Sequence, residues 1–152
     1  MFRGRRRLVA VAVALALLGA GFAGWRLAAG GRVALKNPQA VKAVRAYESA
    51  LGRGDAAAAC AALAPPMQAA VTKAATAYGR FTCVEVMSRL LGTLSSKARA
   101  TIAAASITIL AQTNDTVRVK VAFGSGKAPA EMLVVRSGNG WLVGPTVTAT
   151  RR

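Results

Sequence analysis

Residues 106–123 read SITILAQTNDTVRVKVAF, and here the spacing of the apolar side chains changes from helical to alternating. The pattern is clearest from Thr116 to Phe123, where valines and a phenylalanine alternate with polar or small residues. A period of two is typical of a strand that buries one face and exposes the other. Asn114-Asp115 favours a turn after an earlier alternating run over 107–111. The stretch therefore predicts an antiparallel pair of strands packed on a core.

The sequence after this pair predicts more of the same sheet. Residues 124–129 (GSGKAP) read as a loop between strands. Residues 131–136 are apolar on both faces, which is typical of a strand that is central or covered. The SGNG stretch at 137–140 then predicts a hairpin turn into a strand over 141–143, which Gly144-Pro145 ends.

The chain before the first strand predicts helices. Asn37-Pro38 places an N-cap residue and a first-turn proline ahead of apolar side chains at helical spacing. We expect this helix to end at Gly52 and Gly54. Glu48 is expected to lie off its apolar side, within reach of Arg45 on the same helix.

Three more helical segments are expected before the sheet. Asp55 reads as the N-cap of a short Ala-rich helix, which Pro65-Pro66 breaks. A third segment runs from Met67 to about Tyr78. Residues 82–85 (TCVE) have the form of a capping box and open a fourth helix. Its apolar side is expected to carry Val84, Met87, Leu90, Leu91 and Leu94.

The N-terminal segment predicts a membrane anchor. Residues 8–25 are uncharged and mostly apolar, a length at the lower limit for crossing a bilayer. Four arginines precede the run and are expected to stay in the cytoplasm, so the C-terminal part lies outside. A cleaved signal peptide is the alternative, because residues 21–23 (GFA) offer small residues for cleavage and the domain would then be secreted. The expected segments are a cytoplasmic basic tail at 1–7, a transmembrane helix at 8–25, a linker at 26–37 and an extracytoplasmic domain at 38–150.

The charge points to anionic partners rather than to nucleic acid. The chain of 152 residues has 21 Lys and Arg against 5 Asp and Glu, and 54% of its residues are hydrophobic. Such an apolar content argues against disorder. No basic face with interleaved aromatic residues is evident, so we expect no nucleic-acid partner. Anionic lipid, an acidic envelope polymer and a membrane-complex partner remain the candidates. The sequence does not indicate an oligomeric state.

The two cysteines suggest a disulfide. Cys60 and Cys83 are too few for a structural zinc site, and the chain contains no His to complete one. If the domain lies outside the cytoplasm, a single disulfide between them is the natural interpretation. The alternative is two buried thiols that never meet.

The order of elements resembles exported members of the nuclear transport factor 2-like superfamily, over roughly residues 38–145. The motifs behind the resemblance are residues 44–47 (VRAY), 51–55 (LGRGD), 59–60 (AC), Cys83 and 138–143 (GNGWLV). The resemblance implies an α+β cone of three to four helices packed on an antiparallel sheet of three to five strands. A cone of this kind encloses an apolar pocket, and the alternative for each aromatic residue is simple core packing. The candidate pocket-lining residues are Tyr47, Tyr78, Phe81, Phe123 and Trp141.

No catalytic constellation is evident. Each of the five acids has a structural interpretation, and no two form a pair for acid–base work. The GSGK stretch at 124–127 fails as a phosphate-binding loop, because position 121 is Val and position 128 is Ala. Ser95-Ser96-Lys97 does not make a Ser–Lys pair, because neighbouring residues do not face one another. We therefore expect no catalytic residue, metal ligand or cofactor.

The sequence thus predicts a membrane-anchored, extracytoplasmic, non-catalytic binding or interaction module at the cell envelope. One alternative is a subunit of an envelope transport or secretion complex, of the lipid-import or conjugation type. Another is an isomerase- or dehydratase-like enzyme acting on a small hydrophobic substrate, which the superfamily also contains. In that scheme Tyr47, Tyr78 and Glu85 would be the residues of the active site.

Overall fold

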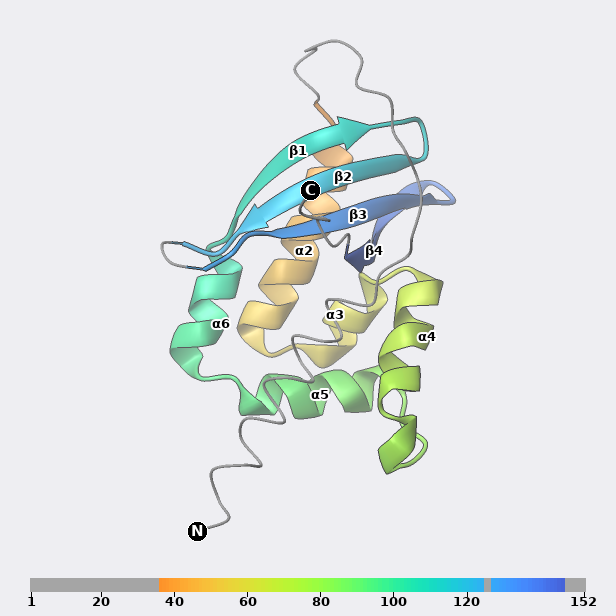
Figure 1. Ribbon diagram of the computed structural model, residues 1–152, viewed down its shortest axis with the longest axis vertical. Coiled ribbons are helices and arrows are strands. Elements are labelled where there is room, and N and C mark those ends of the chain that lie inside the picture. The colour runs from red at the N-terminus through yellow and green to blue at the C-terminus, as the bar shows by residue number, and fades with distance from the viewer. Residues whose placement is uncertain (1–35, 125–126, 147–152) are drawn as a thin grey trace, which may run out of the picture.

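The computed structural model describes residues 36–124 and 127–146, which fold as helices followed by a sheet (Figure 1). The expected basic tail, transmembrane helix and most of the linker lie outside these residues. Within the described part, no helix has the length and apolar character needed to cross a membrane. The helices are α2 (Pro38–Arg53), α3 (Ala56–Ala61), α4 (Pro65–Ala74), the 3-10 turn η1 (Thr76–Tyr78), α5 (Cys83–Thr93) and α6 (Ser96–Ala103). The strands are β1 (Ser106–Gln112), β2 (Thr116–Ala122), β3 (Ala130–Ser137) and β4 (Gly140–Thr146).

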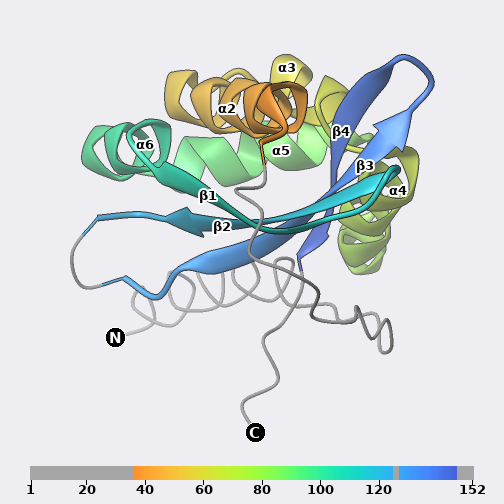
Figure 2. The ribbon, with the colours of Figure 1, turned by 90° about the horizontal axis from the view of Figure 1, so that it is seen from above.

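The sheet is an antiparallel meander in the order β1-β2-β3-β4. The alternation in β2 is reproduced in the fold, because Val117, Val119 and Val121 are fully buried while Lys120 is exposed. Figure 2 shows α2, α3, α5 and α6 together on one side of the sheet. The α+β class and the helices on one face are therefore confirmed, and β3 is central as its two apolar faces predict.

Helix α2 is the element that joins the helical layer to the sheet. Asn37 caps its start by accepting a hydrogen bond from the Ala40 amide at 3.0 Å, and Gly54 ends it with a left-handed φ of 74°. The helix packs on β4, α3 and, most extensively, α6. The helix ends where Gly52 and Gly54 predicted, because Gly52 lies in its last turn and Gly54 follows its last residue. The missing side chain of Gly52 also makes room for Ala103 of α6.

Several predicted boundaries are corrected by the structure. There are five α-helices in the described residues, not three to four, because residues 96–103 form the separate helix α6. Pro65 and Pro66 are the first residues of α4. Proline is tolerated there because the backbone N–H that it lacks would have no partner within the first turn of the helix. Strand β4 runs through Gly144-Pro145 to Thr146.

The last correction follows from the position of β4 at the edge of the sheet, where proline is tolerated. Residues 62–64 partly cover that edge. The Ala64 amide donates to the Val143 carbonyl and the Val143 amide donates to the Ala62 carbonyl, each at 2.8 Å. This short bridge ties the α3–α4 connection to the sheet.

The contact between α2 and α6 gives a test of the packing. A side chain at Gly52 would place its Cβ 2.5 Å from the Cβ of Ala103, so Gly52→Ala forces the helices apart. We expect it to lower the free energy of unfolding by about 1–2 kcal/mol, since overpacking outweighs the helix propensity of Ala. Gly92→Ala on α5 is the matched control, because nothing lies within 4 Å of its Cβ position. Urea denaturation of both variants measures the difference, and equal shifts would contradict the packing described.

Candidate functional site

An open depression of about 590 Å³ lies between α6 and the loop that follows β2. Lys97 and Lys127 bring two exposed ammonium groups to it, and Ser95 and Thr101 contribute two hydroxyls. None of its lining residues is acidic. The described residues that line it are Ser95, Lys97, Ala98, Thr101, Phe123, Gly124 and Lys127. Such a surface suits an acidic group, because the two ammonium groups and the Ser95 hydroxyl can donate hydrogen bonds to phosphate or carboxylate oxygens.

The local sequence explains how this depression is built. Ser95 caps α6 and accepts a hydrogen bond from the Ala98 amide at 3.2 Å, which fixes the start of the helix. Thr101 donates to the carbonyl of Lys97 at 2.9 Å, so its hydroxyl proton is already engaged within the helix. On the opposite side Gly124 has a left-handed φ of 75°, which turns the chain away from β2.

This site was not predicted from the sequence, although both of the stretches that carry its lysines were considered. The GSGK stretch at 124–127 and the Ser95-Ser96-Lys97 stretch were each rejected as a local motif. The structure brings their lysines to one depression across about thirty residues of sequence. A local motif search has no signal for such a meeting, because it depends on where α6 packs.

The aromatic residues proposed to line a pocket lie in different environments. Phe123 is the one that lines the depression. Tyr47 is buried in the core, and Phe81 and Trp141 are half-buried against it. Tyr78 is 73% exposed on η1. The depression therefore brings together only one of the five with the two lysines.

Glu48 occupies the most unusual environment of any acid in the described residues. It is 1% exposed, and neither carboxylate oxygen has a hydrogen-bond partner among residues 36–124 and 127–146. Burial raises its pKa to about 7, an effect that the nearby charge of Arg45 partly opposes. Burial and then the charge of Glu48 likewise raise the pKa of the Tyr47 hydroxyl above its usual range.

The burial of Glu48 corrects the prediction that it lies off the packed side of its helix. Arg45, one turn before it, donates to the carbonyl of Ala105, which lies between α6 and β1. Gly52, one turn after it, lies against Ala103 of α6. Residues three and four apart share one face of a helix, so Glu48 lies on the face that α6 covers. Because α6 was not predicted from the sequence, this face of α2 was expected to be exposed.

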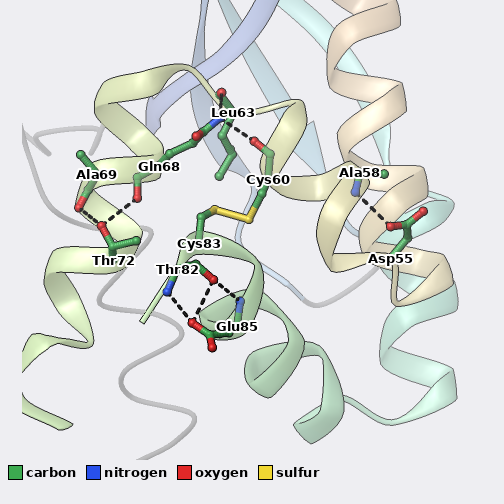
Figure 3. Close-up of a disulfide and its surroundings, with 10 residues drawn as sticks. All are labelled: Asp55, Ala58, Cys60, Leu63, Gln68, Ala69, Thr72, Thr82, Cys83 and Glu85. Carbon is green, nitrogen blue, oxygen red and sulfur yellow. Dashed lines mark hydrogen bonds between the residues drawn. A yellow bond between two sulfur atoms is a disulfide. The ribbon is translucent and has the colours of Figure 1, made fainter. Parts of the chain in front are cut away.

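The predicted disulfide is confirmed. Cys60 of α3 and Cys83 of α5 are joined with a Cα–Cα distance of 6.1 Å (Figure 3). The Thr82–Glu85 capping box stands beside it: the Thr82 amide donates to Glu85 Oε2 at 2.7 Å, and the Glu85 amide donates to Thr82 Oγ1 at 3.3 Å. The bonds that the Thr82 amide and hydroxyl donate to the carboxylate hold the pKa of Glu85 below its ordinary value. Both elements fix the first turn of α5.

Hydrogen bonds tie the neighbouring helix α4 to the same place. The Gln68 side chain donates to the carbonyls of Cys60 and Leu63, both at 2.9 Å (Figure 3). Asp55 caps α3 as predicted, accepting from the Ala58 amide at 2.9 Å. The disulfide thus lies where three short helices meet.

The disulfide also determines which face of α5 is buried. Because Cys83 must face α3, Val84 lies about 100° further round the helix and is 41% exposed. The expected apolar side of this helix is therefore corrected: Val86 is buried instead of Val84.

The remaining acids keep local roles. Glu131 begins β3 almost as predicted, and its Oε2 lies 3.9 Å from Nε of Arg118. Asp115 lies in the β1–β2 turn, where its carbonyl accepts from the amide of Arg136. Over the described ranges there is no group of three or more side chains suited to holding a metal ion.

Glu48 generates a pH-dependent prediction. Its folded pKa of about 7 lies above the ordinary 4.5, so the folded chain holds a proton that the unfolded chain has already released. Stability therefore falls as pH rises from about 4.5 to about 7 and stays lower above that range. Glu48→Gln removes this titration and is expected to raise the free energy of unfolding at about pH 8 by about 1–3 kcal/mol. Urea denaturation across pH measures it.

Glu85→Gln provides the control of opposite sign. The pKa of Glu85 is lowered on folding, so its contribution to stability is present above its unfolded pKa and is lost as pH falls. The Glu85→Gln variant should be less stable than wild type at about pH 8. If Glu48→Gln is also less stable than wild type at that pH, the ionised Glu48 carboxylate does not destabilise the folded chain and this prediction is wrong.

Breaking the disulfide should loosen α5 before the sheet. Its closed loop spans a sequence separation of 23, for which the chain-entropy account gives a loss of about 3 kcal/mol on reduction. Helix α5 packs chiefly on α3 and α4, not on the sheet. We expect hydrogen exchange in reductant to accelerate more at α5 amides than at β2 and β3 amides. Equal acceleration would show that α5 does not depend on the bond in particular.

Comparison of the sequence with protein-family models, with curated proteins and with solved structures finds no match in any of the three. What the chain does has therefore to be inferred from its own residues.

Proposed function

We propose that the chain is a membrane-anchored, extracytoplasmic, non-catalytic binding module at the cell envelope, and that its basic depression holds an acidic group of the partner. The observation that carries the proposal is the meeting of Lys97 and Lys127 at one open depression with no acidic residue in its lining. A phosphate or carboxylate placed there is attracted by both ammonium groups at once.

The charge of the surrounding surface supports the same partner chemistry. Residues 36–124 and 127–146 contain thirteen Lys and Arg against five Asp and Glu. One acid is buried, at Glu48, and two are engaged in capping hydrogen bonds, at Asp55 and Glu85. A basic residue near an anionic membrane contributes about 1 kcal/mol of attraction. The surface thus favours anionic lipid headgroups or acidic envelope polymers.

Two features support a location outside the cytoplasm. Stable disulfides form in oxidising compartments and are rare in cytosolic proteins, and Cys60 and Cys83 form one. The apolar run at 8–25 with arginines before it favours an anchor with its C-terminal side outside, and secretion after cleavage is the alternative. The order of helices and meander supports a nuclear transport factor 2-like cone as part of this proposal.

The depression is tested with paired charge variants of the full chain, held in nanodiscs of phosphatidylcholine. The probe is poly(glycerol phosphate), titrated by calorimetry at two salt concentrations. Lys97→Gln combined with Lys127→Gln should weaken binding about tenfold and reduce its salt dependence. Lys42→Gln combined with Lys120→Gln removes the same charge from exposed positions outside the lining.

The control pair distinguishes binding at the depression from attraction by the net positive charge of the whole surface. The control pair should change the affinity by less than about threefold, as expected for distant surface charges. If both pairs weaken binding equally, the probe senses net charge and the depression is not a site. Vesicles containing phosphatidylglycerol, used in place of the polymer, distinguish a lipid headgroup from a polymer as the source of the phosphate.

A second candidate function, acid–base catalysis on a small hydrophobic substrate, has one observation in its favour. The buried carboxyl of Glu48 has a pKa of about 7, which is the range that a general base needs. The depression does not include Glu48 among its lining residues, so a substrate would need another way in. An enzyme of this type would lose turnover in Glu48→Gln while poly(glycerol phosphate) binding stays unchanged.

A further inference from the structure

Helix α6 forms one side of the depression and is attached to the domain by its opposite face. Lys97 and Thr101 line the depression. Ala103 and the backbone carbonyl of Arg99 instead lie against Gly52 of α2. Successive residues of an α-helix are turned by about 100°, so the two pairs lie on opposite faces of α6. A movement of α6 relative to α2 therefore moves this side of the depression.

The contact with α2 is the main attachment of α6. Among the described elements, α6 packs extensively on α2 alone, and none of its eight residues is buried. Figures 1 and 2 both show α6 beside α2, at the margin of the helical layer. Because α6 buries little apolar surface of its own, whatever weakens its contact with α2 loosens that side of the depression.

Glu48 lies on the face of α2 that makes this contact. It stands one turn after Arg45 and one turn before Gly52, and both of these residues contact α6 or the residues just after it. The Glu48 side chain is 1% exposed, and both carboxylate oxygens lack a hydrogen-bond partner among residues 36–124 and 127–146. Burial without a partner costs an ionised carboxylate far more than a neutral carboxyl. The α2–α6 contact therefore accommodates the neutral form of Glu48 better than the ionised form.

Two cations belong to the α2–α6 contact, and neither forms a salt bridge with Glu48 in the described structure. Arg45 is the nearby charge that acts on Glu48, but its guanidinium donates to a backbone carbonyl. Arg99 of α6 extends to Gly54, beyond the last residue of α2, where its Nη1 lies 2.7 Å from the position of a Cβ. Tyr47, beside Glu48 on α2, is buried, and this burial raises the pKa of its hydroxyl so that it stays neutral.

The other elements that pack on α2 bring no charge to Glu48. Helix α3 and strands β1 and β4 contain no Asp, Glu, Lys, Arg or Tyr. On β3, Glu131 pairs in register with Lys120, which is exposed on the face of the sheet away from the helices, and Arg136 is exposed near the end of the strand. An ionised Glu48 thus gains a favourable environment by reaching water. The separation of α6 from α2 admits water with little loss of packing, because α6 has no buried residue.

We propose that ionisation of Glu48 loosens α6 from α2 and thereby weakens the binding of an acidic group at the depression. This inference rests on the proposed function of the depression and identifies the group that regulates it. While Glu48 is neutral, α6 packs on α2 and the depression keeps Lys97 and Lys127 together. When Glu48 is ionised, α6 separates part of the time and takes Lys97 with it.

The regulation is expected to operate near neutral pH. The pKa of Glu48 is about 7, so its carboxyl is mostly neutral at about pH 6 and mostly ionised at about pH 8. The affinity of the depression should therefore fall as pH rises through this range. The chain contains no His, the side chain that ordinarily titrates there, and Cys60 and Cys83 are joined in the disulfide.

The first measurement is calorimetric binding of poly(glycerol phosphate) to the full chain in phosphatidylcholine nanodiscs, at about pH 6 and about pH 8. The phosphodiesters of this probe keep their charge across the range. Wild-type affinity should fall about fivefold from the lower to the higher pH, the small end of the usual coupling between two sites. Glu48→Gln and Glu48→Met should remove this fall, and circular dichroism checks that each variant is folded. Glu131→Gln removes an acid outside the α2–α6 contact and should keep the wild-type fall.

The second measurement is hydrogen exchange without the probe, which separates a movement of α6 from a direct effect of the Glu48 charge on the ligand. At about pH 8 the α6 amides should exchange faster than the β2 amides, as local opening requires. They should also exchange about fivefold faster in wild type than in Glu48→Gln, in proportion to the change in affinity. At about pH 6 wild type and variant should agree.

Three results overturn the inference: equal α6 exchange in wild type and Glu48→Gln at about pH 8, wild-type affinity that does not change with pH, or a fall in affinity that persists in Glu48→Gln. Failure of the proposed function looks different. If Lys97→Gln combined with Lys127→Gln binds the probe as wild type does, the depression is not a site. The exchange of α6 amides still shows in that case whether Glu48 controls the position of α6.

Discussion

The Cys60–Cys83 disulfide holds the start of helix α5 against α3. Figure 1 shows α5 along one edge of the helical layer, with η1 near its first residue and α6 near its last. The depression begins just after the last residue of α5, where Ser95 caps α6. A shift of α5 would therefore move the α6 side of the depression relative to the sheet.

The composition of the neighbouring helix explains why a covalent bond is needed. Helix α3 reads AAAACA, and alanine side chains bury little apolar area against α5. Because α5 packs chiefly on α3 and α4, its attachment to the rest of the domain passes through this weak contact. The disulfide and the Gln68 hydrogen bonds to the end of α3 compensate. The same bond requires an oxidising environment, which connects the stability of the domain to its proposed location.

The alternating pattern of residues 116–123 predicted the sheet correctly, because the burial of alternate side chains is a local property of a strand. Asn37, Asp55 and the Thr82–Glu85 pair were likewise recognised, since a cap involves only residues three apart. Helix α6 was missed although Ser95 caps it, because its sequence SKARATIA has little apolar periodicity. Missing α6 also hid the burial of Glu48 and the existence of the depression. Both require two segments distant in sequence to be placed side by side.

We propose that α5 is held by a disulfide that forms outside the cytoplasm, and thiol trapping in intact cells is the sharpest test of this. Cells that produce the full chain are treated with a membrane-permeant alkylating reagent before lysis, and the peptides containing Cys60 and Cys83 are weighed without reduction. The account predicts a disulfide-linked pair of peptides with no alkylated cysteine. Alkylation of both cysteines would contradict it, because α5 would then keep its place without the bond and the domain would not need an oxidising compartment.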